Sequence, residues 1–215
     1  DPADLNALYQ TFLSFTELEL QGVAINVHPL NGDSFSFVQG TASVRNQGQN
    51  HYLHVNASLE GNPEPLTISF ELQGEDLNQA SGTLHILVPN ADYSQVFAGQ
   101  DLGALAILGL EGSGQVWIGV EAGQLSAATV EFDVPGLTIS GKRREQARQT
   151  ESEQLGLTNL KGMARLSHNS EESVWELALA NMSVTYRSDS WQSFNAHVLF
   201  TPDQLVEIAA DHLDL

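Results

Sequence analysis

The chain has 215 residues, and its 27 acidic and 8 basic side chains give a formal net charge of -19. This length suits a single β domain with a sizeable core, while the charge repels phosphate groups over about 8 Å at physiological salt and excludes nucleic acid as an expected partner. The absence of cysteine excludes disulfides, cysteine-ligated zinc and a cysteine nucleophile.

Targeting signals are absent from the residues given. No apolar run approaches the roughly 20 residues of a membrane helix, and the first residues lack the basic and apolar regions of a signal peptide. We therefore expect either a cytoplasmic protein or a segment of a larger one.

Three short helices are predicted. One lies at the start of the chain, where Pro2 suits the first helical position and apolar residues recur at three- and four-residue spacing, namely Leu5, Leu8, Tyr9, Phe12 and Leu13. A second follows Asn90 as its cap and carries Tyr93, Val96 and Phe97. The third is expected over Pro202–Ala210, after a capping box that begins at Thr201.

The residues between the helices alternate between apolar and polar, which is typical of strands with one apolar face. The stretch Gly112–Ser140 shows the pattern most clearly, with a turn predicted at Glu121–Gln124. At Gly22 and again at Pro135-Gly136 the alternation shifts by one residue, and a β-bulge at each place keeps the apolar side chains on one face. The polar run Lys142–Gln154 is predicted to form a mobile loop.

These elements predict one mainly β domain over residues 1–215. We expect an extended, curled antiparallel meander sheet of about ten to twelve strands, with a hydrophobic concave face, short helices at both ends and one in the middle. The apolar face could instead be part of an ordinary closed core, capped by the helices at the two ends.

Candidate catalytic and metal-binding residues are scattered. His51 and His54 are three residues apart, so on a strand they point to opposite faces and are expected to be surface histidines rather than metal ligands. No metal site, cofactor or catalytic residue is predicted. The carboxylates most open to glycosidase-like pairing sit at polar positions of amphipathic strands: Glu71, Glu111, Glu121, Glu131 and Asp133.

Trp117 also falls at a polar position of its strand, where an exposed aromatic ring could bind a sugar. A tryptophan packed under a helix or loop is the competing interpretation.

Several stretches resemble, in order, the large-domain pattern of the YhdP family, which are AsmA-like proteins of Gram-negative bacteria. They are FTELELQGVAINVH, SGTLHILVPNADYSQVF, the stretch Gly112–Ser140, LTNLKGMARL, VWELALANMSVTYRSDSW and the terminal IAADHLDL. The resemblance implies a non-enzymatic periplasmic segment of a protein that is anchored in the inner membrane and moves phospholipids toward the outer membrane along a hydrophobic groove.

The groove that this resemblance implies would hold the phospholipid acyl chains against the apolar side chains of the central strands. The candidates are Leu84, Ile86, Val88, Val116, Ile118, Val120, Val130, Phe132 and Val134. Two alternatives stay open, namely a structural or interaction β domain with a closed core, and a carbohydrate-binding or carbohydrate-active module.

Overall fold

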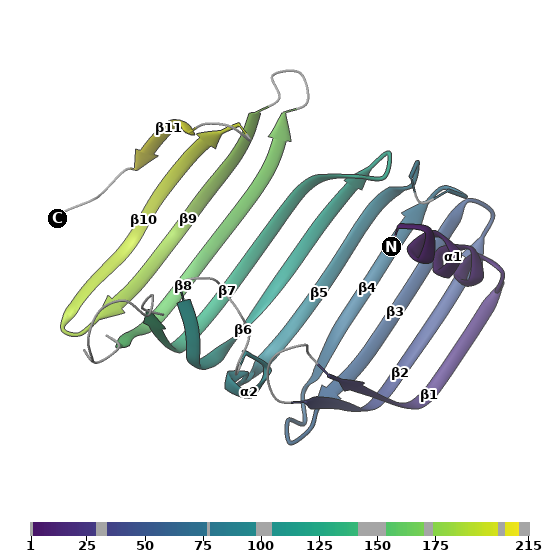
Figure 1. Ribbon diagram of the computed structural model, residues 1–215, viewed down its shortest axis with the longest axis horizontal. Coiled ribbons are helices and arrows are strands. Elements are labelled where there is room, and N and C mark those ends of the chain that lie inside the picture. Colours follow the sequence, from purple (N-terminus) through teal and green to yellow (C-terminus); the bar gives the residue numbers. More distant parts are fainter. Residues whose placement is uncertain are drawn as a thin grey trace, which may run out of the picture.

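The computed structural model describes residues 2–28, 34–76, 78–97, 105–141, 154–169, 174–201 and 205–210. Within them, eleven strands form one sheet in the order of the chain, and each strand is antiparallel to the next (Figure 1). The fold is therefore mainly β and an antiparallel meander, which confirms the fold class predicted from the sequence. The predicted loop over residues 142–154 lies, apart from Gln154, outside the described residues.

The three longest strands, β6, β7 and β8, lie in the middle of the sheet. Their bounds are β1 Glu17–Val27, β2 Phe35–Gln47, β3 Asn50–Leu59, β4 Pro65–Gln73, β5 Ser81–Asp92, β6 Leu105–Glu121, β7 Gln124–Gly141, β8 Gln154–Asn169, β9 Val174–Tyr186, β10 Asp189–Phe200 and β11 Leu205–Ala210. Helix α1 spans Pro2–Leu13 and helix α2 spans Ser94–Phe97. Neither of these two described helices has the length and apolar character that crossing a membrane requires.

Helix α2 forms near the predicted place but with a different cap. Asn90 lies within β5, and the Asp92 carboxylate accepts a hydrogen bond from the backbone N–H of Ser94 at 2.8 Å. Hydrogen bonding from the Ser94 side chain, together with this backbone bond, holds the pKa of Asp92 below its usual value, because both stabilise the ionised carboxylate.

The helix predicted over Pro202–Ala210 is wrong for its described part, which begins at Leu205. Residues Leu205–Ala210 form β11, which pairs with β10 and places Ile208 opposite Val198. The spacing of Leu205, Ile208 and Ala209 fits a helix, but the unpaired backbone groups at the edge of β10 offer a full set of ladder hydrogen bonds, which outweighs a weak helical preference.

The closed core is also wrong for the part of the chain that the structure describes. The sheet stays open, since the strand order ends at β1 on one side and at β11 on the other. The buried cluster is small and lies at one end of the sheet, where Tyr9 packs with Leu72 and Ala80. Only α1 contributes a buried side chain from outside the sheet and its turns.

β-Bulges occur in most of the pairings between neighbouring strands. The bulge predicted at Gly22 is confirmed, because the register of β1 against β2 shifts on both sides of Val23 and Gly22 has a φ of 69°. The shift at Pro135-Gly136 is confirmed as well, since Leu137 lies opposite Leu110 on the same face as the residues before it. In Figure 1 the end of β1 turns sharply from the direction of the rest of the strand.

The hairpin between β6 and β7 is a two-residue turn. Ala122 and Gly123 both have positive φ, 48° and 72°, as expected for the turn type whose twist matches that of the strands. Gly123 lies against the chain at Asn78, where a Cβ atom would approach the Asn78 carbonyl oxygen to 2.5 Å. Ala122 carries the cost of a left-handed conformation that glycine avoids.

We expect Ala122→Gly to raise the free energy of unfolding by about 0.5–1 kcal/mol, because glycine adopts the left-handed conformation without steric cost. Gly123→Ala is the matched control and should lower it by more than 1 kcal/mol, since the added methyl group meets backbone atoms. Urea unfolding of both variants measures the two changes. Equal effects of the two substitutions would contradict the turn geometry.

Candidate functional site

The nine residues predicted to line a groove lie on one face of three adjacent strands, β5, β6 and β7. Ile86 lies opposite Val116, and Val116 lies opposite Val130. Leu84 pairs with Ile118 in the neighbouring row, while Val88 and Phe132 flank Gly114. Val120 and Val134 continue this face along β6 and β7. All nine side chains are half-buried, so each remains partly accessible at the surface.

The same face continues through all the other strands. Two adjacent rows of residues cross the sheet, and every position in both rows is apolar; together these rows are called the apolar band. One row is Leu18, Val44, Leu53, Phe70, Leu84, Ile118, Ala128, Leu166, Leu177, Val198 and Ile208. The other is Leu20, Ala42, Val55, Ile68, Ile86, Val116, Val130, Ala164, Leu179, Ala196 and Ala210.

The band is long and runs across the strands. Because neighbouring strands lie about 4.8 Å apart, the eleven strands give each row a length of about 48 Å along the sheet. The polar rows on the opposite face carry the charged side chains, for example Glu17 opposite Arg45 and Glu71 opposite Thr83. The apolar band and these charged rows therefore lie on opposite faces of the sheet.

Little covers the apolar band. Of its residues only Val44 is buried, and at the two edges Leu20 and Ile208 are 44% and 63% exposed. The others are half-buried, apart from the exposed Ala210. Side chains in the core of a closed domain are usually almost fully buried. The band thus has the composition of a core and the exposure of a surface.

Helix α1 lies at one side of the band, across the ends of β2, β3 and β4 (Figure 1). The Tyr9 hydroxyl donates a hydrogen bond to the Gly74 carbonyl at 2.7 Å, and the Tyr9 ring meets the His51 ring edge-on. Phe12 and Leu13 pack against the buried cluster together with Phe70, which belongs to the band. α1 therefore covers the margin of the band over these strands.

The two histidines considered as metal ligands differ in environment. They point to opposite faces as predicted, and His54 is exposed, but the expectation of a surface residue is wrong for His51, which is 3% exposed beneath α1. Its Nδ1 atom lies 2.9 Å from Asn46 Oδ1. Among the described residues no three histidine, aspartate or glutamate side chains are placed to hold a metal ion.

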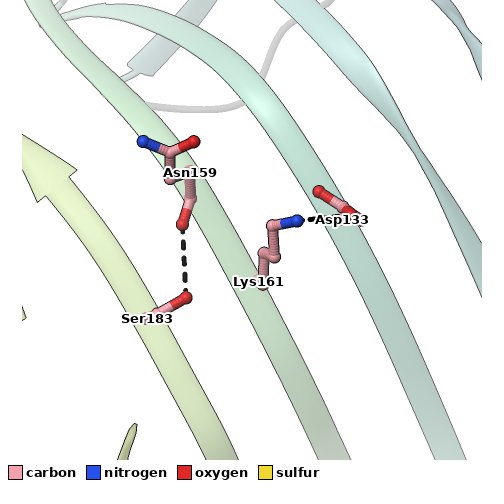
Figure 2. A network of polar contacts seen from close by, with 4 residues as sticks. All are labelled: Asp133, Asn159, Lys161 and Ser183. Atoms are coloured by element: carbon pink, nitrogen blue, oxygen red, sulfur yellow. Dashed lines mark hydrogen bonds and ion pairs between the residues drawn. The ribbon is translucent and has the colours of Figure 1, made fainter. Parts of the chain in front are cut away.

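The candidate carboxylates belong to the exposed polar surface. Glu71, Glu111, Glu121 and Glu131 are exposed. Asp133 accepts a hydrogen bond from the Lys161 ammonium group at 2.8 Å, and the nearby Ser183 hydroxyl donates to the Asn159 carbonyl on the next pair of strands (Figure 2). These contacts are cross-strand links on the polar face.

Trp117 lies on the polar face, as its position in the alternation predicts. Its ring stacks on that of His85 at 5.1 Å between centroids, so one face of the indole is already occupied. A sugar-binding platform presents a free aromatic face.

A surface depression of about 590 Å³ lies over the polar face of β1–β4, with Glu17, Glu19, Arg45 and Glu71 in its lining. Glu17 pairs with Arg45 at 3.8 Å, and both side chains are mostly exposed. This is an open, charged surface, whereas the apolar band is the feature without an ordinary structural explanation.

The chain was compared with protein-family models, with curated proteins and with solved structures, and none of the three comparisons found a match.

The exposure of the band predicts how substitutions affect stability. Ile118→Ala should lower the free energy of unfolding by about 1 kcal/mol, because a half-exposed side chain has less apolar area to lose. Leu72→Ala, which truncates a side chain buried under α1, should cost about 2–4 kcal/mol. Urea unfolding measures both. A loss at Ile118 as large as that at Leu72 would show that the band is covered in solution.

Burial raises the pKa of the Tyr9 hydroxyl, and the negative charge of Asp76 raises it further. Since the folded-state pKa lies above the unfolded value of about 10, the stabilisation by Tyr9 is complete below pH 10 and is lost as the pH rises through the folded-state pKa. We expect α1 to detach in strong alkali, and Tyr9→Phe to remove that pH dependence. The difference between the ultraviolet titration curves of the two proteins isolates the ionisation of Tyr9, and a Tyr9 step at or below about pH 10 would contradict the raised pKa.

Proposed function

We propose that this chain is a non-enzymatic segment of an envelope protein that transports phospholipids between the inner and outer membranes. In this proposal it lies in the periplasm, the parent protein is anchored in the inner membrane, and the apolar band shields the acyl chains. The single observation that carries the proposal is the band itself, an uncovered apolar surface that crosses every described strand. The resemblance to the YhdP family supports the same function.

The energetics favour such a surface. Exposing an acyl chain to water costs about 0.8 kcal/mol for each CH₂ group, so a tail of about sixteen carbons faces a barrier on the order of 10 kcal/mol. A continuous hydrocarbon surface replaces the contacts that the tail loses in the bilayer. Movement along a row then exchanges one set of apolar side chains for the next, with no polar residue between them.

The charges of the described residues favour binding through the tails. The four basic residues described lie outside the band, since Arg45, Lys161 and Arg165 are on the polar face and Arg187 packs over the Tyr186 ring in a turn. No cation in this part of the chain is placed to bind a phosphate from within the band. Headgroups would stay in water, and the net negative charge would discourage the segment from adhering to anionic membranes.

A second candidate function is an interaction domain whose sheet edges pair with another polypeptide. The open edges at β1 and β11 favour it, because an edge strand presents unpaired backbone groups and Ile208 on β11 is largely exposed. The two functions differ in what meets the band. In the lipid-transport function, acyl chains contact the band. In the interaction-domain function, a partner polypeptide pairs with an edge strand and covers the band from that edge.

A photo-crosslinking amino acid at Ile118, on the apolar face, should form phospholipid adducts in cells that express the full-length protein. The matched position is Glu131, exposed on the polar face of the neighbouring strand, where we expect few or none. Mass spectrometry of the adducts identifies the bound species. Equal lipid adducts at both positions, or none at Ile118, would overturn the lipid function, and protein adducts at Ile118 would favour the interaction domain.

A further inference from the structure

We propose that α1 is a displaceable cover on the margin of the apolar band, and that its release adds a third row of the sheet to the lipid-binding face. The inference rests on the proposed function, because it describes how access to the same surface is controlled.

The third row lies directly beside the band. It runs from Asn46 on β2 and His51 on β3 through Leu72 on β4, Gly82 on β5 and Val120 on β6 to Leu125 on β7, so that its apolar part begins at Leu72. Leu72 is 5% exposed beneath α1, whereas Leu125, in the same row, is 40% exposed. The row is therefore closed at one end and open at the other, and α1 is the element that closes it.

Apolar packing of Tyr9, Phe12 and Leu13 and a small number of side-chain hydrogen bonds hold α1 in place. Tyr9 donates to the Gly74 carbonyl, and the side-chain amide of Gln10 donates to the Glu75 carbonyl. At the other end of the helix, Asn46 Nδ2 donates to the carbonyls of Phe12 and Phe15. None of these bonds belongs to the ladders between β2, β3, β4 and β5, so α1 can leave while the strands stay paired.

The docked state of α1 has an unfavourable free-energy contribution at His51. Because the Asn46 amide nitrogen donates to α1, its oxygen is the acceptor for His51, and the imidazole proton sits on Nδ1. The His51 Nε2 atom is then left buried without a hydrogen-bond partner in the described part of the chain. Release of α1 exposes this atom to water, so the docked state loses a favourable interaction that the open state regains.

Two substitutions should shift the equilibrium between docked and released α1 in opposite directions. Asn46→Ala removes both hydrogen bonds from its side chain to the end of α1 and favours the open state. His51→Leu replaces the imidazole, and with it the unpartnered Nε2 atom, by a hydrocarbon and favours the closed state, while water can reach the half-buried Asn46 oxygen. The matched control is Asn56→Ala, which removes an asparagine bonded to Thr67 on the polar face of the adjacent strand, away from α1.

The experiment uses the whole chain with vesicles of phosphatidylethanolamine and phosphatidylglycerol that contain a phospholipid with a photoreactive group in its acyl chain. After irradiation, mass spectrometry gives the ratio of adducts on the peptide with Leu72 to adducts on the peptide with Ile118. Amide hydrogen exchange of α1, measured in the same samples, reports whether the helix is docked.

We expect Asn46→Ala to raise the adduct ratio and the α1 exchange rate about 25-fold, because it removes two hydrogen bonds to the end of α1 and the loss of each is worth about fivefold. His51→Leu should lower both, and Asn56→Ala should change neither. His51→Leu gives an independent test if Asn46→Ala does not fold, because its expected effect has the opposite sign.

Adducts on Ile118 with a ratio that does not change in Asn46→Ala or His51→Leu would overturn the cover while leaving the proposed function in place. Adducts at neither site in any variant would overturn the proposed function and the cover with it.

Discussion

The structure depends on the register between neighbouring strands. Side chains alternate with a period of two, so a slip of one residue in any pairing would turn a whole strand's apolar side chains to the charged face. Here the apolar rows stay on one face across all ten pairings despite local register shifts, and Leu18 at one edge belongs to the same row as Ile208 at the other. The apolar band and the surface on which α1 packs both follow from this alignment.

β-Bulges allow long strands to bend without losing that alignment. Each extra residue reverses the alternation along the sequence, and the local distortion restores the side chains to their original face. Gln39, Asn159 and Asn181 take up the left-handed conformation at such points, with φ values between 52° and 55°. A strand can therefore read as two short segments in the sequence and still present one continuous face.

The limits of sequence-based prediction follow from the same physics. The alternation around Val116 and Val130 placed the groove candidates on one face, and glycine or proline marked the bulges at Gly22 and Pro135. The irregularity at Gln39 is likewise marked by Gly40, whereas the one at Asn181 has neither glycine nor proline beside it. The burial of His51 depends on α1, a contact between distant parts of the chain, and the full rows depend on register, which no single segment encodes.

The strand order also has a consequence for how such a sheet can change in length. Because every strand pairs only with its neighbours in sequence, the molecule is a linear array, in which each hairpin is a self-contained increment. Insertion or loss of one hairpin would change the sheet by two strands, about 10 Å, and would leave the direction and facing of all other strands unaltered. Duplication of a hairpin within the coding sequence would thus change the length of the sheet, measured across its strands, in steps of two strands.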